Sequence, residues 1–178
     1  NRAAVIETGH NQLAIVFKEK LRILPRSPVI TVAPEVAAES LQSRDERAAS
    51  AVKAWQDSGA NVSLFVSAPD GLAFGRPLSV EMYDGMGAGL ISKIDTVIPT
   101  YDAKDSGGLD AAVASSIALL AERARDANAL FPWYARIVAV EGNKVYINAG
   151  REAGITIGQR LKVIRGGKVV LGLGFAPG

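Results

Sequence analysis

Cysteine is absent from this chain of 178 residues, and histidine occurs only once. Without cysteine, these residues contain no disulfide, no thiolate metal ligand and no cysteine nucleophile. The single histidine, His10, excludes a multi-histidine metal site, and we interpret it as a solvent-exposed residue near a helix start. The sequence therefore predicts no metal, no cofactor and no catalytic residues, and we expect a protein that is not an enzyme.

Long hydrophobic runs are also absent, although hydrophobic residues make up 48% of the chain. That content is sufficient for a packed core and argues against disorder. No run approaches the roughly 20 apolar residues that a membrane-spanning helix needs, so we expect a soluble chain. Residues 1–5 show neither an initiator methionine nor a signal-peptide pattern, and we interpret them as the start of a processed or trimmed chain.

Charge is divided unequally along the sequence. Residues 1–132 contain 13 Lys and Arg against 16 Asp and Glu, a net charge of −3. Residues 133–178 contain 7 Lys and Arg against Glu141 and Glu152, a net charge of +5, and the two parts sum to the formal +2 of the chain. Such a break in charge balance indicates two modules. We expect an α/β domain over residues 1–130 and a small basic β module over residues 131–178.

The beginning of the chain carries patterns of both helix and strand. Apolar residues at helical spacing over 13–24 predict a helix that Pro25 ends, although the alternation over 13–17 fits a strand nearly as well. Residues 28–32 form a β-branched run between prolines and predict a short strand. Residues 5–6 are consistent with the remnant of an edge strand.

The patterns of the next hundred residues complete an α+β domain. Pro34 suits the first turn of a second helix, and Gly59 is a suitable residue to end it. Residues 62–66 predict a strand, and the apolar stripe over 109–124 predicts a third helix. We therefore expect a mixed sheet with about three helices.

A glycine-rich turn separates two strand patterns at 78–82 and 90–94. The turn contains Asp84, Gly85 and Gly87, and we expect its glycines to supply the positive φ angles of a tight reversal. Glycines at alternate positions also resemble a phosphate-binding loop. Such a loop opens a helix, whereas residues 90–94 have the pattern of a strand, so a hairpin turn is favoured.

Three aspartates, Asp102, Asp105 and Asp110, lie close together before the third predicted helix. A calcium loop needs oxygen ligands at alternating positions and a closing bidentate acid, and that spacing is missing here. Capping of the helix by Asp105 or Ser106 is the simpler interpretation.

The last 48 residues have the sequence pattern of a small β module. Strands are predicted at 136–140, 144–147, 160–164 and 169–171, and turns every eight to twelve residues are typical of a small barrel or sandwich. Between the two pairs lie Gly150, Gly154 and Gly158, which we expect to serve backbone geometry rather than a ligand.

Basic and aromatic side chains are interleaved in this module, and they form the candidate interaction surface: Trp133, Tyr134, Arg136, Lys144, Arg160, Lys162 and Arg165. Three interpretations stay open. The charges are the solvated face of alternating strands, a surface for an acidic protein or envelope partner, or a site for single-stranded nucleic acid. Trp133 with Phe131 either joins the two modules or forms a docking hot spot.

The stretch 135–165 resembles a known family through VYINAG at 145–150, AGI at 153–155 and IGQRL at 157–161. It is similar to the C-terminal module of the flagellar assembly protein T family. The upstream order of helices and strands more loosely resembles the α/β domain of the TolB amino-terminal type and of curli-secretion-type lipoproteins. The resemblance implies a periplasmic or outer-membrane-associated scaffold, often part of a ring or secretion assembly, that has no catalytic activity.

These observations favour a non-enzymatic assembly or scaffold protein of the bacterial cell envelope, either flagellar-ring-like or secretion-lipoprotein-like. Its expected partners are other envelope or basal-body proteins, with copies of itself in a ring as an additional option. A nucleic-acid-binding module that uses the basic C-terminal part is the alternative hypothesis.

Overall fold

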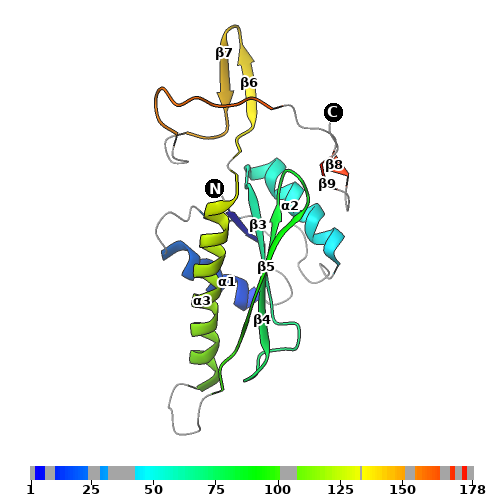
Figure 1. Cartoon of the computed structure of the whole chain (residues 1–178), viewed down its shortest axis with the longest axis vertical. Coiled ribbons are helices and arrows are strands. Elements are labelled where there is room, and N and C mark those ends of the chain that lie inside the picture. Colours follow the sequence, from blue (N-terminus) through cyan, green and yellow to red (C-terminus); the bar gives the residue numbers. More distant parts are fainter. Residues whose placement is uncertain are drawn as a thin grey trace.

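A five-stranded mixed sheet forms the centre of the computed structural model (Figure 1). The structure describes residues 3–6, 11–23, 29–31, 43–100, 108–132, 134–150, 155–164, 169–170 and 174–175. The strands follow the order β2-β1-β3-β4-β5. Their bounds are Ala3–Ile6 for β1, Val29–Thr31 for β2, Val62–Ser67 for β3, Pro77–Asp84 for β4 and Leu90–Val97 for β5. The first three strands are parallel, and β3, β4 and β5 are antiparallel.

Three helices cover the two faces of this sheet: α1 (Asn11–Ile23), α2 (Arg44–Ser58) and α3 (Gly108–Leu130). Helices α1 and α3 lie on one face, where they share the larger core with strands β3 and β4. Helix α2 lies on the other face over a smaller core. The expected α+β fold with a mixed sheet and three helices is therefore confirmed.

The alternation of side chains along β3 explains why both faces are covered. Leu64 points to the α1 and α3 side, and Phe65 points to the α2 side, where its ring meets Tyr83 edge-on with centroids 5.4 Å apart. A strand buried on both faces reads as a continuous apolar run rather than an alternating one. This accounts for the run at residues 62–66, which correctly predicts β3.

Helix α2 begins later than Pro34, the predicted start. Ser43 is its N-cap, with an extended backbone, and it forms a capping box with Glu46. Glu46 Oε2 accepts the backbone N–H of Ser43 at 2.9 Å, and Ser43 Oγ accepts the N–H of Glu46 at 3.2 Å. A reciprocal cap satisfies two N–H groups that the helix itself leaves without partners, so it fixes the start at Arg44. The predicted end is correct, since Gly59 has a φ of 73° and its N–H bonds the Trp55 carbonyl.

Two strand predictions are also wrong. Strand β1 is not an edge strand, because it lies between β2 and β3 and pairs with both. Residues 160–164 are described and form no strand. Their alternation is not matched by burial, since Leu161, Val163 and Ile164 are all exposed and no covered face selects a strand there.

The part of the chain after α3 contains four short strands in the described residues. Strand β6 (Ile137–Glu141) pairs with β7 (Lys144–Ile147), and β8 (Val169–Val170) pairs with β9 (Gly174–Phe175). The predicted hairpin over 136–147 is confirmed, with Gly142 at a φ of 60° in its turn. Within the described parts of the chain, no helix combines the length and apolar character needed to cross a membrane.

Candidate interaction surface

The hairpin of β6 and β7 stands off the end of the α/β domain (Figure 1). We call residues 137–147 the arm. In the described residues its two strands pair only with each other. The register places Val140 opposite Val145, and the pairing of β6 with β7 shifts register at Val138. Val140 is 63% exposed and Val145 54% exposed, so the arm presents a valine face, defined by Val140 and Val145, to solvent.

The opposite face of the arm is polar and aromatic. Ala139 lies opposite Tyr146, and Glu141 lies opposite Lys144 beside the turn. The Tyr146 hydroxyl donates a hydrogen bond of 3.2 Å to Glu141 Oε2. Because charged and hydroxyl groups are confined to this face and to the tip, the arm is amphipathic.

The base of the arm is fixed to the α/β domain by hydrogen bonds to backbone carbonyls. Arg136 Nη1 donates to the Gln56 carbonyl at 2.7 Å, at the C-terminal end of α2. Asn61 Nδ2 donates to the Tyr134 carbonyl at 2.8 Å, and Asn61 is 2% exposed. A cation at a helix C-terminus is favoured by the helix dipole, and a buried amide needs partners.

Asn148 closes the base of the arm. Its Oδ1 accepts the Arg136 N–H at 2.7 Å, and its own N–H donates to the Arg136 carbonyl at 3.0 Å. Its side chain lies directly against Gly59, where an added Cβ would overlap Asn148 Nδ2. We call Gln56, Gly59, Asn61, Tyr134, Arg136 and Asn148 the joint. The joint brings residues 56–61 together with residues 134–148, so it sets the direction of the arm.

The described residues of the predicted basic surface belong to different parts of the structure. Arg136 belongs to the joint, and Lys144 lies at the tip of the arm. Arg160 and Lys162 are exposed in a segment without regular structure. Tyr134 packs edge-on against Phe131, with ring centroids 6.2 Å apart. Trp133 and Arg165 lie outside the described residues, so their predicted roles stay predictions.

The turn between β4 and β5 is built differently from the prediction. Its left-handed residue is Ala88, with a φ of 57°, whereas Gly85 and Gly87 do not have positive φ angles. Gly85 is required for close approach instead. A Cβ there would lie 2.6 Å from the Ala60 carbonyl oxygen and 2.8 Å from Trp55 Cβ. The turn thus packs tightly against α2, and the Gly85 N–H bonds the Asn61 carbonyl at 2.9 Å.

Asp84 stabilises this turn through hydrogen bonds to the backbone. Its Oδ1 accepts the Met86 N–H at 2.9 Å, and its backbone N–H donates to the Gly89 carbonyl at 2.9 Å. Burial raises the pKa of Asp84, and hydrogen bonds from the backbone N–H groups of Met86 and Gly87 oppose that rise. A Cβ at Gly87 would lie 2.5 Å from Asp84 Oδ2, so a larger residue there would displace the carboxylate.

The remaining predicted glycines and aspartates have no shared site. Gly158 has a φ of 84°, which is the backbone role expected for it. Gly150 has open space around its Cα, and Gly154 lies outside the described residues. Asp110 is in the first turn of α3, and the predicted caps at 105 and 106 and the neighbouring Asp102 lie outside the described residues. In the described part of the chain, no group of three acidic or histidine side chains gathers.

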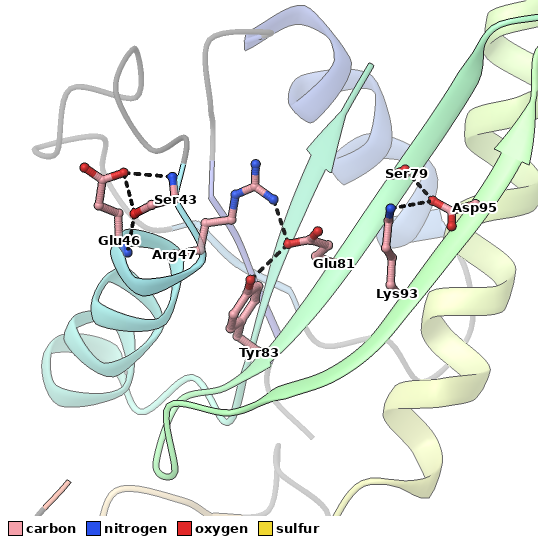
Figure 2. Close-up of polar contacts among 8 residues, drawn as sticks. All are labelled: Ser43, Glu46, Arg47, Ser79, Glu81, Tyr83, Lys93 and Asp95. Atoms are coloured by element: carbon pink, nitrogen blue, oxygen red, sulfur yellow. Dashed lines mark hydrogen bonds and ion pairs between the residues drawn. The ribbon is translucent and has the colours of Figure 1, made fainter. Parts of the chain in front are cut away.

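A half-buried polar cluster lies between α2 and the sheet (Figure 2). Arg47 Nη1 is 2.6 Å from Glu81 Oε2, and the Tyr83 hydroxyl donates to the same oxygen at 3.0 Å. The two charged side chains are 19% and 16% exposed. Burial, the hydrogen bond to Glu81 and its negative charge together raise the pKa of Tyr83 to about 12. The ion pair of Arg47 with Glu81 fastens α2 to β4.

A second polar group joins β4 to β5 at some distance from this cluster (Figure 2). The Ser79 hydroxyl donates to Asp95 Oδ1, and Lys93 Nζ lies 3.6 Å from the same oxygen. Lys93 and Asp95 are about half exposed, and the pair lies along the edge of the sheet. Charged residues on an edge strand discourage unwanted pairing with other strands.

Sequence reasoning missed the valine face and the joint. The valines lie on strands that the sequence correctly predicts, but the predicted small barrel or sandwich would cover them rather than expose them. The joint has no local signal, because Asn61 and Asn148 are separated by 87 positions and neither belongs to a recognisable motif.

Comparison with known proteins gives distant structural likenesses, which include PelC and TolB. A PelC variant from Paraburkholderia phytofirmans, solved as a dodecamer, has a TM-score of 0.40 and 13% identity over 67% of this chain and 84% of that one. TolB from Acinetobacter baumannii has a TM-score of 0.38 and 14% identity over 72% of this chain and 27% of that one, so the chain spans about a quarter of the TolB chain. No protein-family model and no curated protein matches this sequence. Likenesses at this level do not assign a function. No family model supports the resemblance to flagellar assembly protein T.

Proposed function

We propose that this chain is a non-enzymatic assembly or scaffold protein of the bacterial cell envelope that works through protein–protein contacts. The valine face of the arm is the contact surface. In this proposal the α/β domain serves as the rigid base, and the joint holds the arm in a fixed direction.

The exposed valine face is the observation that carries the proposal. A two-stranded hairpin is at best marginally stable in water, and three strands or a packed face are normally needed. Here Val140 and Val145 are more than half exposed, and each arm strand has an edge with no partner in the described residues. Apolar strands with open edges pair readily with other chains. A partner that covers the valine face would complete the hairpin.

The polar clusters support a role without catalysis. Glu81 Oε2 accepts hydrogen bonds from Arg47 and Tyr83, and Asp84 Oδ1 accepts the Met86 N–H within its own turn. These groups bind other parts of the protein, so they are not aimed at a substrate. Each of them has a structural function that its geometry explains.

The assignment to the envelope rests on the resemblance of residues 135–165 to the flagellar T module and of the upstream domain to the TolB type. In this proposal the chain works in the periplasm or at the outer membrane, in a flagellar ring or a secretion apparatus. This part of the proposal is independent of the arm geometry, so it needs its own test.

Imaging of flagellar basal bodies in cells of the source organism tests the proposal. The strains to compare are the wild type, a deletion strain, and deletion strains carrying either the wild-type gene or Val140→Asp. We expect a ring or disc to be absent from the deletion strain, restored by the wild-type gene and not restored by Val140→Asp. Intact basal bodies in the deletion strain would indicate that the protein works in another envelope complex. Full restoration by Val140→Asp would remove the arm from the proposal.

The nucleic-acid alternative is tested by titrating a labelled single-stranded oligonucleotide at low and high salt. Phosphate contacts release counterions, so true binding weakens steeply as salt rises. The described exposed cations of the surface are Arg136, Lys144, Arg160 and Lys162, and Arg136 also donates to the Gln56 carbonyl. We expect no binding at low salt, and salt-sensitive binding would favour the alternative.

A further inference from the structure

The outer edge of β7 carries backbone groups that no strand among the described residues pairs with. The two residues beside the turn of the arm form its hydrogen-bonded closing pair, so the next pair, Val140 with Val145, is not hydrogen-bonded across the arm. The Val145 N–H and carbonyl therefore point away from β6, and by alternation those of Ile147 do the same. The Asn148 N–H donates to the Arg136 carbonyl on the inner side, as this alternation requires.

A segment with the pattern of a strand lies further along the same chain. Residues 160–164, which we call the strap, alternate the basic Arg160 and Lys162 with the apolar Leu161 and Val163. Leu161 is 44% exposed and Val163 72% exposed. Figure 1 shows that the strap, drawn in orange, runs across the direction of the arm strands, and it forms no strand in this structure. The strap thus has the pattern of a strand without a strand to pair with.

The chain holds the start of the strap near the base of the arm. The Ile155 N–H donates to the Gly150 carbonyl at 3.3 Å, and Gly150 is two residues beyond Asn148 of the joint. A turn follows, in which the Gln159 N–H donates to the Thr156 carbonyl at 3.2 Å. Because β7 runs from the tip of the arm toward its base, a strap that leaves this turn and runs outward along β7 is antiparallel to it.

We propose that the strap pairs antiparallel with the outer edge of β7 and gives the arm a third strand. Full overlap of the strap with residues 144–148 places Val163 beside Val145 and Lys162 beside Tyr146. Val163 then extends the valine face, and Lys162 lies on the polar face with Tyr146. A slip of one residue would place Lys162 on the valine face, so the pattern of the strap disfavours it. Three strands with an apolar face are stable where a two-stranded hairpin is marginal.

The strap is favoured over a strand from another molecule because it belongs to the same chain. Only residues 148–159 separate it from β7. A short connection of this kind gives an effective concentration in the millimolar range, which a separate strand must exceed to compete. Pairing also closes an edge that would otherwise be open to unwanted strands. This inference goes beyond the proposed function and does not depend on it, since it concerns the chain alone.

Disulfide trapping in the purified full chain tests the pairing, because the chain has no native cysteine. Tyr146 uses its backbone groups on β6, so it forms a non-hydrogen-bonded pair with Lys162, with Cα atoms about 4.5 Å apart. This distance lies within the range of roughly 4.4–6.8 Å that a disulfide needs. The test variant is therefore Tyr146→Cys with Lys162→Cys. The matched control is Tyr146→Cys with Val163→Cys, which has nearly the same connection but places the second thiol on the opposite face.

Both variants are equilibrated in a glutathione redox buffer at low protein concentration, and mass spectrometry quantifies the intramolecular disulfide. We expect the equilibrium constant for the disulfide between positions 146 and 162 to exceed that between positions 146 and 163 at least about tenfold. Equal disulfide formation in the two variants, whether high or low, would show that the strap has no fixed pairing and would overturn the inference. A preference for position 163 would overturn it as well, because the strap would then present its other face.

A proline substitution shows whether the preference comes from strand pairing. Val163→Pro removes the N–H that the strap donates to the Val145 carbonyl, so in the variant with cysteines at 146 and 162 we expect the disulfide to fall to the level of the control. Ile157→Pro is the matched proline control. Gly158, the third residue of its turn, has a φ of 84°, and a turn of this type favours proline at the second position. An unchanged disulfide in Val163→Pro would overturn the proposed third strand.

Discussion

The substitution Gly59→Ala tests how the arm is held on the α/β domain. Gly59 has a φ of 73°, and an L-residue in this left-handed conformation costs roughly 1–2 kcal/mol. The new Cβ would also overlap Asn148 Nδ2, so Asn148 must move. Displacement breaks its 2.7 Å hydrogen bond from Arg136, which is worth about 1 kcal/mol. We expect a total loss of about 2–3 kcal/mol in the free energy of unfolding.

The two contributions can be separated with Asn148→Ala. In that background the overlap disappears, and only the backbone cost of roughly 1–2 kcal/mol remains for Gly59→Ala. Urea unfolding of the four proteins of this cycle should give a coupling of about 1 kcal/mol. Equal costs of Gly59→Ala in both backgrounds would contradict the contact between Gly59 and Asn148. A cost near zero in both would contradict the left-handed cap.

Three further outcomes follow from the polar clusters and the turn. Gly85→Ala should lower stability by roughly 1–3 kcal/mol in urea unfolding, because its Cβ meets the Ala60 carbonyl and Trp55 Cβ, and an unchanged midpoint would contradict that close approach. Tyr83→Phe should cost about 1.5–3 kcal/mol, the range for a hydrogen bond to a charged group, while ultraviolet titration of the wild type should show one tyrosine ionising near pH 12. The pKa of Asp84 is raised in the folded protein, so its contribution to the free energy of unfolding is fully present below the ordinary pKa of 3.8. This contribution is lost as pH rises through the pKa of the folded protein. Asp84→Asn should therefore gain stability relative to wild type as pH increases from acid to neutral, and a constant difference would refute this.

The elements that could be predicted from sequence are those whose signals are local. The run at residues 62–66 correctly gives β3, because a strand buried on both faces reads as a near-continuous apolar run. The stripe at 109–124 correctly gives α3, because burial of these residues follows the helical period. The hairpin over 136–147 is likewise encoded by its turn and alternation. The predicted start of helix α2 at Pro34 is wrong, because Ser43 and Glu46 form a capping box that fixes the start at Arg44.

The features that escaped prediction depend on contacts between distant residues. The prediction that the glycines of the turn after β4 have positive φ angles is wrong. Position 85 needs a glycine because α2 packs against it, and no local sequence pattern reveals this contact. Residues 160–164 have a strand pattern but no covered face. The joint depends on Asn61 and Asn148 meeting the backbone of residues 134–136, and only the folded chain brings them together.

The most direct test of the arm as a contact surface uses the absence of native cysteine. Val140→Cys and Ile157→Cys each place a single thiol on an exposed position, and a maleimide probe reports its accessibility. We expect the thiol at 140 to react readily in the purified protein at low concentration and to be protected in isolated cell envelopes, while the thiol at 157 reacts in both. Equal reactivity of the thiol at 140 in the two preparations would contradict the account.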